Sequence, residues 1–313
     1  MSQIVVSEYL QDRYLDELRA GHDVFYDPDL HGDRPHLLDR ARHAAAIFVR
    51  NRTRVDAELV SAAGRLRVVG RLGVGLDNID MDACDRAGIR VIPAVGANAT
   101  SVAEYVIGAM LVLVRGIYGM TPAMVAGEWP RQGHAFGHEV SGKTLGLLGF
   151  GSIAQRVTAR ASALEMRVVA HDPYLPWNDP AWKSATRIEI EELLSQADIL
   201  SVHTPLNDET RNLIDEKAIA RMKPSAILIN TSRGGTVDET AVAAALREGR
   251  LGGAALDVFV AEPLGPAAAS VFAGVPNLLL PPHVAGNTHE SVDRVASMIV
   301  DAVLRVLDSS PTA

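Results

Sequence analysis

The sequence predicts an α/β fold with two parallel sheets, each covered by helices on both faces. Short apolar runs that are typical of buried strands alternate with helical patterns along almost the whole chain. The chain has 313 residues, of which 48% are hydrophobic, and this is enough apolar material for two cores. One apolar run, residues 144–149, leads into a glycine-rich turn and then a helical pattern.

The first part of the chain is expected to form a small sheet. Its apolar runs are rich in Val and Ile, and they lie at residues 4–6, 46–49, 66–70 and 89–92. Helical patterns between these runs, such as 11–20 and 56–63, make a series of β-α units. A long apolar helix should then begin near Ala99 and end before Gly116, and Asn98, Thr100 or Ser101 could cap it. We expect this helix to cross into the second domain.

The second part repeats the pattern with more strands. The predicted strands are residues 144–149, 167–171, 199–203, 226–230, 253–257 and 278–280. Helical patterns such as 188–196 and 239–247 separate them, and a final amphipathic helix at 291–307 should pack back on the first domain. We therefore expect two doubly wound, Rossmann-like domains with a cleft between them: a discontinuous one, residues 1–97 plus 287–313, and a second one, residues 98–286.

The glycine-rich turn has the spacing of a dinucleotide site. Gly149 and Gly151 allow a tight turn, and Ala154 takes the position that serves close packing between helix and strand. The helix that begins at Ser152 and Ile153 can direct its N-terminal N–H groups at a pyrophosphate. Asp172, at the end of the next apolar run, can accept hydrogen bonds from ribose hydroxyls and would repel the 2′-phosphate of NADP. The pattern therefore predicts NAD as the cofactor, although Asp172 could simply be a surface acid in a turn.

Composition excludes several other classes of partner. A formal net charge of −8 argues against nucleic acid and anionic membranes, which need a basic surface. The single Cys84 excludes a disulfide framework and a cysteine-based metal site, and we expect no metal. Residues 1–6 lack the pattern of a signal peptide, and the longest apolar stretch, 102–114, contains Glu104 and is too short to span a bilayer. We expect a cytoplasmic protein.

Three further segments follow strands of the second sheet, where an open α/β fold binds its ligands: residues 230–235, 257–263 and 280–286. With the glycine pattern, they resemble the D-isomer-specific 2-hydroxyacid dehydrogenase family over essentially the whole chain. Residues 69–80 and 100–104 look like the phosphoglycerate dehydrogenase branch of that family. Residues 49–53, 127–132 and 172–176 look most like the sulfolactate dehydrogenases within that branch.

The resemblance implies a catalytic set of Arg233, Glu262 and His283. Reduction of a 2-keto acid needs a cation that fixes the carboxylate and polarises the carbonyl, and the planar guanidinium of Arg233 can do both. It also needs a proton donor at the carbonyl oxygen, for which His283 is the candidate, acting as the base in the reverse direction. A carboxylate beside an imidazole favours the protonated form, so Glu262 should keep this acid loaded at neutral pH.

Further cofactor contacts are implied by the same resemblance. Asp257 looks like the residue that binds the nicotinamide carboxamide, unless it only caps the next turn. The segment that lines adenine and ribose would include His203, Thr204 and Pro205, unless it only ends a strand. The expected cofactor contacts are completed by Thr231, Ser232 and Arg233.

The identity of the substrate depends on whether the site binds a second anionic group besides the carboxylate. Val74 and Gly75, in the turn that begins at Gly73, could offer backbone N–H groups to the substrate carboxylate. A sulfonate or phosphate at C3 could be bound by residues at the ends of first-domain strands, namely Arg50, Asn51, Arg52 and Arg71, with Arg233 and His283 on the other side. A solvated basic face is the alternative, because further arginines, Arg54, Arg65 and Arg67, lie nearby.

The predicted activity is hydride transfer between nicotinamide and C2 of a small anionic 2-hydroxy or 2-keto acid. Sulfolactate is our first choice of substrate, and 3-phosphoglycerate, hydroxypyruvate or glyoxylate are the alternatives. A non-catalytic NAD-sensing protein, such as the corepressors related to this family, is a different class that could keep the Arg, Glu and His.

Residues 116–141 have no clean helical or strand period, and their large apolar residues are Tyr118, Met120, Met124, Trp129 and Phe136. Family members use this arm to embrace a second subunit, so we expect a homodimer through residues 98–141.

Overall fold

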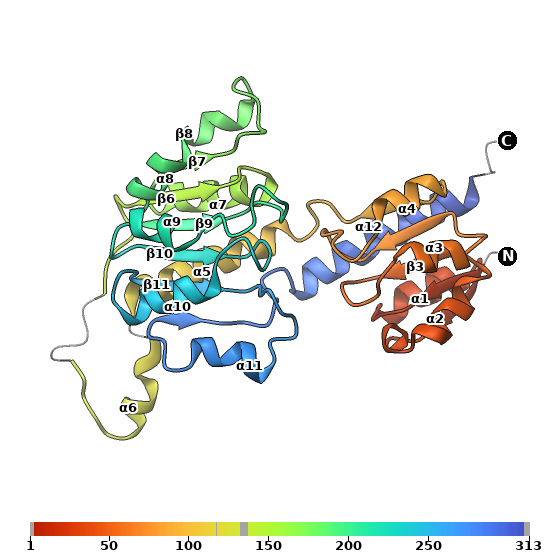
Figure 1. The fold of residues 1–313 in the computed structure, drawn as a ribbon, viewed down its shortest axis with the longest axis horizontal. Coiled ribbons are helices and arrows are strands. Elements are labelled where there is room, and N and C mark those ends of the chain that lie inside the picture. The colour runs from red at the N-terminus through yellow and green to blue at the C-terminus, as the bar shows by residue number, and fades with distance from the viewer. Residues whose placement is uncertain (1–2, 117, 132–136, 310–313) are drawn as a thin grey trace. The chain divides into compact units, whose positions relative to one another are not determined.

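A computed structural model describes residues 3–116, 118–131 and 137–309 of the chain. It separates into two compact units, drawn in Figure 1, which are Met1–Asn98 with Asn287–Ala313, and Ala99–Gly286. Each unit has a parallel sheet with its own core, as the sequence predicts. Within the described ranges, no helix combines the length and the apolar character needed to cross a membrane.

The first unit contains a five-stranded sheet in the order β2-β1-β3-β4-β5, with every neighbouring pair parallel. Its strands are β1 (Gln3–Val6), β2 (Asp23–Tyr26), β3 (Ala44–Val49), β4 (Val68–Arg71) and β5 (Arg90–Pro93). Four of them match predicted strands. Strand β2 was not predicted, because it lies at the edge of the sheet, begins with an acid and is only half buried, so it has no continuous apolar run.

Helices cover both faces of this sheet: α1 (Asp12–Arg19), α2 (Arg34–Ala41), α3 (Ala57–Ala62), α4 (Met81–Arg86) and α12 (His289–Asp308), with a 3-10 turn η1 at Leu30–Gly32. The side chains of β1 alternate between the two cores, since Ile4 packs with α1 and α12 whereas Val5 packs with α2, α3 and α4. A Cβ on Gly70 of β4 would come within 2.9 Å of the Ile299 side chain. Helix α12 can therefore lie very close to the sheet.

The second unit contains a seven-stranded sheet in the order β12-β11-β10-β9-β6-β7-β8, again with parallel pairs throughout. Its strands are β6 (Thr144–Leu148), β7 (Arg167–His171), β8 (Thr186–Arg187), β9 (Ile199–Val202), β10 (Ile227–Asn230), β11 (Gly253–Leu256) and β12 (Leu278–Leu279). Only β8, which has two residues at the sheet edge, was not predicted. The chain runs outward from β6 through β7 to β8, and then from β9 to β12 on the other side.

The helices of this unit are α5 (Ala99–Arg115), α6 (Thr121–Val125), α7 (Ser152–Ala163), α8 (Ile190–Gln196), α9 (Glu216–Arg221), α10 (Glu239–Arg247) and α11 (Pro266–Ala269), with 3-10 turns η2 (Tyr118–Met120), η3 (Pro180–Ser184) and η4 (Ser270–Phe272). One face of the sheet is covered by α5 and α7, and the other by α8, α9 and α10. Helix α5 was expected to cross between the domains. It instead begins at the first residue of the second unit and packs within that unit.

Candidate active site

The strand order of the second unit reverses between β6 and β9, and the first ligand-binding features lie at the carboxyl ends of these two strands. Gly149 follows β6 and has φ = +88°, a conformation that glycine adopts without strain. A Cβ at this position would also come within 2.8 Å of the carbonyl oxygen of His203, which follows β9. Both the backbone angle and the close approach require glycine here.

The N-terminus of α7 is open toward the same place. Gly151 is the N-cap residue and has no side chain to accept hydrogen bonds from the first turn. Apart from its two chain neighbours, none of the described residues has an atom within 4 Å of where its Cβ would stand. Ser152 and Ile153 supply the first helical N–H groups, and Ala154 is fully buried against the sheet. This turn therefore offers unobstructed backbone donors of the kind that bind a pyrophosphate.

Asp172 lies at the end of β7 and supports this turn directly. Its Oδ2 accepts a hydrogen bond from the N–H of Phe150 at 2.8 Å. Its Oδ1 accepts from the N–H groups of Tyr174 and Leu175 at 2.9 and 3.1 Å. Asp172 therefore holds the turn in which it lies, which was the alternative considered from the sequence. Its Oδ2 also keeps a second lone pair that could accept a hydrogen bond from a ribose hydroxyl.

Three buried polar atoms at the carboxyl ends of β9 and β10 have no hydrogen-bond partner among the described residues: Nδ1 of His203, Oγ1 of Thr204 and Oγ1 of Thr231. Burial lowers the pKa of His203 to about 4, so its ring is neutral at pH 7. Unpaired buried polar atoms are costly unless a ligand satisfies them. With the open end of α7, they fit a dinucleotide with polar groups along its length.

The remaining predicted cofactor residues have partners in their own loops. The hydroxyl of Ser232 donates to Oδ1 of Asn230 at 2.8 Å, which ties the start of the 231–235 segment to β10. Pro205 is exposed, and its carbonyl accepts from the hydroxyl of Thr210 at 2.6 Å. These contacts give the two loops defined shapes at the sheet edge.

Glu262 and His283, which are 21 residues apart, form a close pair. Nδ1 of His283 lies 2.7 Å from Oε2 of Glu262, while Oε1 of Glu262 accepts from the N–H of Phe259 at 3.0 Å. Burial raises the pKa of Glu262, but these hydrogen bonds and the nearby charges of His283 and Arg233 outweigh it and leave the pKa below its usual value. The carboxylate is therefore ionised at neutral pH, and Nδ1 must be the donor. Nε2 of His283 is the nitrogen left for other chemistry.

The loop that carries Arg233 packs against the loop that carries Glu262. A Cβ on Gly234 would overlap the carbonyl of Phe259, so only glycine permits this approach. Nη1 of Arg233 donates to the carbonyl of Ser232 at 2.6 Å, and the guanidinium is close enough to lower the pKa of Glu262. The structure thus brings together all three residues of the predicted catalytic set.

Asp257, at the end of β11, holds the segment that follows His283. It is 1% exposed, and its two oxygens accept from the N–H groups of Val284 and Ala285 at 2.8 and 2.9 Å. His283 itself has φ = +56°, which is uncommon for a residue other than glycine. Asp257 therefore holds the turn after His283, and not the turn that follows its own strand, which was the alternative to carboxamide binding.

Apart from Arg233 and His283, the predicted substrate residues lie in the first unit at and after the carboxyl ends of β3 and β4. Arg50 is half-buried, and Asn51 and Arg52 are exposed. Arg71 differs, because it is 8% exposed and its Nε donates to the carbonyl of Gly75 at 2.8 Å. A Cβ on Gly73 would overlap the Arg71 guanidinium, so this side chain lies across the turn that contains Val74.

Sequence analysis missed several acids that shape these loops. Glu239, the first residue of α10, accepts from the N–H of Val260 at 2.7 Å and so holds the loop that leads to Glu262. Glu8 accepts from backbone N–H groups of the segment that carries Arg50 and Arg52. Glu8 lies two residues after a predicted strand, and that position was the available signal. Within the ranges that the structure describes, no group of three His, Cys, Asp or Glu residues is placed to hold a metal ion.

Comparison with known proteins gives the class to which this site belongs. Residues 107–285 match the family model described as "D-isomer specific 2-hydroxyacid dehydrogenase, NAD binding domain". The chain is 51% identical over 308 residues to an (S)-sulfolactate dehydrogenase from Chromohalobacter salexigens, covering 98% of this chain and 99% of that protein. It is 39% identical over 271 residues to a D-3-phosphoglycerate dehydrogenase from Mycobacterium leprae, covering 87% of this chain and 51% of that protein. The crystal structure of a glyoxylate reductase from Paecilomyes thermophila superposes with a TM-score of 0.88 at 29% identity, covering 98% of this chain and 96% of that one.

The chain belongs to the D-isomer specific 2-hydroxyacid dehydrogenase family. It is an NAD-dependent oxidoreductase that transfers hydride between nicotinamide and C2 of a small 2-hydroxy or 2-keto acid. The chain spans nearly the whole length of the sulfolactate dehydrogenase but about half the length of the phosphoglycerate dehydrogenase.

Proposed function

We propose that this enzyme acts on a D-configured 2-hydroxy acid with a second anionic group at C3, and that (S)-sulfolactate is its substrate. The proposal is supported by the 51% identity to an (S)-sulfolactate dehydrogenase over nearly the full length of both chains. 3-Phosphoglycerate is the second candidate, favoured by the D-3-phosphoglycerate dehydrogenase relative and by its charge pattern. Both acids combine a 2-hydroxy carboxylate with a further anion.

The stereochemical label of sulfolactate agrees with the specificity of the family. Sulfur gives the CH₂SO₃⁻ substituent priority over the carboxylate, whereas in lactate the carboxylate has priority over the methyl group. (S)-Sulfolactate therefore has the same arrangement about C2 as D-lactate, which is labelled (R). A site built for D-2-hydroxy acids can accept (S)-sulfolactate without any change at C2.

The pair of Glu262 and His283, 2.7 Å apart beside Arg233, is the observation that carries the proposed mechanism. When bound, NAD would accept the hydride in oxidation, and NADH would donate it in reduction. In oxidation, Nε2 of neutral His283 takes the proton of the C2 hydroxyl while the hydrogen on C2 leaves as hydride, and the C–O bond becomes a carbonyl. In reduction, His283 returns this proton to the carbonyl oxygen.

The other two residues of the set prepare this proton transfer. Glu262 accepts the Nδ1 proton, which fixes the tautomer and the direction of the ring and stabilises the imidazolium that forms in oxidation. Arg233 would bind the substrate carboxylate with its planar fork and polarise the carbonyl oxygen. Arg50 and Arg52 would bind the sulfonate, whereas Arg71 serves mainly to hold the turn at Gly73.

The cofactor contacts are proposed from the same geometry. The pyrophosphate would bind the N–H groups at Gly151, Ser152 and Ile153, and the adenosine ribose would bind Asp172. The unpaired atoms of His203, Thr204 and Thr231 would meet polar edges of the dinucleotide. Asp257 could bind the carboxamide only with lone pairs that Val284 and Ala285 leave free. In this scheme the second unit binds NAD.

We also propose that the enzyme is a cytoplasmic homodimer. Figure 1 shows α6 projecting away from the other elements of its unit, and Val125 and Trp129 on and after this helix are 84% and 73% exposed. Large exposed apolar side chains on a projecting arm indicate a protein interface. Gln132 and Phe136 of the predicted arm lie outside the described residues. Analytical ultracentrifugation of wild type and Trp129→Glu tests this proposal, which predicts a dimer that the variant weakens.

A substrate panel tests the activity. Purified enzyme with NAD is assayed on (S)-sulfolactate, D-3-phosphoglycerate, D-glycerate and D-lactate, and with NADH on glyoxylate and hydroxypyruvate. The proposal predicts the highest kcat/KM for (S)-sulfolactate. A preference for D-glycerate or D-lactate would contradict the proposal and indicate a dehydrogenase that acts on hydroxy acids without a second anionic group.

A further inference from the structure

The loop at residues 50–53, which carries Arg50 and Arg52, is anchored by a buried carboxylate. Glu8, two residues after β1, is 4% exposed. Its Oε1 accepts from the N–H groups of Arg50 at 2.7 Å and Thr53 at 3.0 Å, and its Oε2 accepts from the N–H of Arg52 at 3.2 Å. A buried carboxylate is costly unless its oxygens are hydrogen-bonded. The 50–53 loop must hold its shape for these bonds to form.

Asn78 fixes the carbonyl groups of the same loop. Its Nδ2 donates to the carbonyl of Arg50 at 2.9 Å and to the carbonyl of Thr53 at 2.6 Å. The hydroxyls of Ser7 and Thr53 are 2.8 Å apart, which adds a side-chain contact from the end of β1. The loop is therefore held through both its N–H and its C=O groups.

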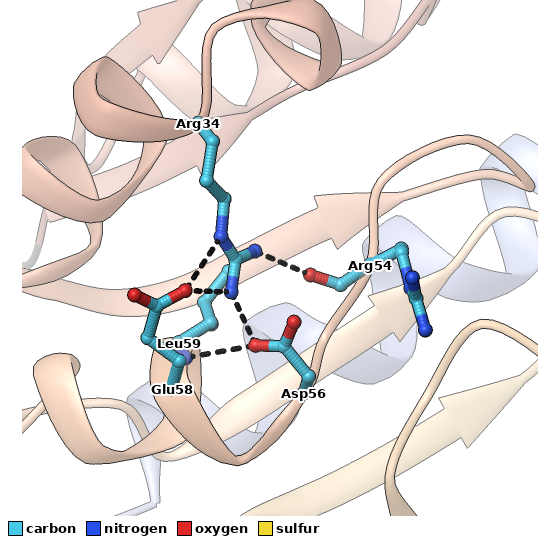
Figure 2. A network of polar contacts seen from close by, with 5 residues as sticks. All are labelled: Arg34, Arg54, Asp56, Glu58 and Leu59. Carbon is cyan, nitrogen blue, oxygen red and sulfur yellow. Dashed lines mark hydrogen bonds and ion pairs between the residues drawn. The ribbon is translucent and has the colours of Figure 1, made fainter.

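Arg34 fixes the chain just after the loop, as Figure 2 shows. Its Nη1 donates to the carbonyl of Arg54 at 2.9 Å, and its Nε and Nη2 donate to Glu58 at 3.1 and 3.0 Å. It also pairs with Asp56, whose side chain caps α3 by accepting from the N–H of Leu59 at 3.1 Å. The segment from residue 50 to the start of α3 thus has a defined path.

The backbone N–H groups of this loop and the arginine side chains that it carries have different partners. The N–H groups of Arg50 and Arg52 point to Glu8, whereas the Arg52 side chain is exposed and its Nη1 lies 3.4 Å from Nε2 of His31. By charge alone, a carboxylate under this loop would weaken the binding of an anion to the neighbouring arginines. By geometry, it would strengthen binding, because the guanidinium groups start from a fixed backbone and lose less freedom when they bind.

We propose that Glu8 is a positioning residue for the second anion of the substrate, acting through the backbone of Arg50 and Arg52. By setting the directions in which these two side chains leave the loop, it increases the preference for doubly anionic acids over acids with the carboxylate alone. This inference rests on the proposed role of Arg50 and Arg52 in binding the sulfonate.

Glu8→Gln separates the charge effect from the geometric effect, because the two have opposite signs. Glutamine can keep one oxygen on the N–H groups of Arg50 and Thr53, but its NH₂ group would face the N–H of Arg52. Positioning predicts a KM for (S)-sulfolactate that rises by roughly tenfold, the loss expected for one charge-assisted hydrogen bond. KM for D-lactate and kcat for both acids should stay close to wild type. If only the negative charge of Glu8 mattered, its removal in Glu8→Gln would lower the KM for (S)-sulfolactate.

A double-mutant cycle identifies the residue through which Glu8 acts. In an Arg52→Ala background, Glu8→Gln should raise the KM for (S)-sulfolactate much less than in wild type. Asp179→Asn is the matched control, because Asp179 also accepts a backbone N–H, that of Ala181 at 2.8 Å, but lies in the second unit and not in the unit that carries the loop. This control should leave both KM values unchanged.

If Glu8→Gln does not fold, Asn78→Ala releases the same loop and should raise KM in the same way.

The outcomes distinguish the inference from the proposed function. If Arg52→Ala or Arg50→Ala raises the KM for (S)-sulfolactate but Glu8→Gln lowers it or leaves it unchanged, the positioning role is wrong and the proposed function stands. If both arginine variants bind (S)-sulfolactate as wild type does, Arg50 and Arg52 do not bind the second anion. The proposed role of Glu8, which depends on them, is then wrong as well.

Discussion

Nδ1 of His283 lies 2.7 Å from Oε2 of Glu262, and the second oxygen of that carboxylate is held by the N–H of Phe259. The carboxylate therefore has one oxygen for the protein backbone and one for the imidazole. Because the pKa of Glu262 is lowered, it remains an acceptor throughout the neutral range. In the proposed mechanism, the proton that moves in catalysis is therefore the one on Nε2 of His283.

Replacement of His283 should remove the acid-base step and leave cofactor binding in place. His283→Asn is the suitable variant because φ is +56° at this residue and asparagine tolerates that conformation better than most residues. We expect kcat to fall by about 10² to 10⁴, the usual contribution of a positioned general acid or base. The dissociation constant for NADH, measured by fluorescence titration, should change little. A variant with near-normal kcat would assign the proton transfer to another group.

Glu262→Gln should lower kcat in both directions. Glutamine keeps the size of the side chain but removes the negative charge that, in the proposed mechanism, holds the Nδ1 proton of His283 and stabilises the imidazolium. The measurement is kcat and KM for a 2-keto acid at one fixed pH, with folding checked by circular dichroism. A kcat that coincides with wild type, in a folded variant, would remove Glu262 from the mechanism.

Asp172→Ala should shift cofactor preference toward NADP. The change removes a negative charge that would repel the 2′-phosphate and leaves room for that group. It should also lower the Tm, since three backbone N–H groups lose their acceptor. Asp179→Ala is the control, because Asp179 also accepts a backbone N–H, that of Ala181 at 2.8 Å, in the same unit. The ratio of kcat/KM with NADP to that with NAD should rise in the first variant only. A wild type that already prefers NADP would refute the role given to Asp172.

Asp198 should make the stability of the second unit depend on pH. Burial raises the pKa of Asp198, but hydrogen bonds from Lys223 and from the N–H of Thr144 outweigh it, so the pKa lies below its ordinary 3.8. A lowered pKa in the folded state stabilises the protein above the ordinary value, and this stabilisation is lost as the pH falls through the folded pKa. Asp198→Asn should therefore lower the Tm at pH 7 by a few degrees, from a loss on the order of 1 kcal/mol. The difference from wild type should shrink as the pH falls below 3.8 and through the folded pKa, as followed by circular dichroism. An equal difference at pH 7 and at pH 3 would contradict this assignment.

Much of this fold could be predicted because buried parallel strands give continuous apolar runs, as in β6 and β9, and because glycine at position 149 is required twice over. The edge strands β2 and β8 have no such signal, since solvent on one side removes the need for an apolar run. The residue types of Arg233, Glu262 and His283 indicated the chemistry, but only the structure shows the 2.7 Å contact. The side chain of Arg71 could not be placed from sequence, because its position depends on the shape of the Gly73 turn.

Substrate preference in arginine variants tests whether Arg50 and Arg52 bind the second anion of the substrate. The measurement is the ratio of kcat/KM for (S)-sulfolactate to that for D-lactate, in wild type and in Arg50→Ala, Arg52→Ala and the double variant, with NAD. A charge-assisted hydrogen bond is worth about 1.5 to 3 kcal/mol, so the loss of the contacting arginine should lower this ratio roughly tenfold to a hundredfold. Arg233→Ala should damage both substrates and leave the ratio nearly unchanged. If the ratio is the same in wild type and in the Arg50 and Arg52 variants, these arginines are a solvated surface and the enzyme is not selective for a doubly anionic acid through them.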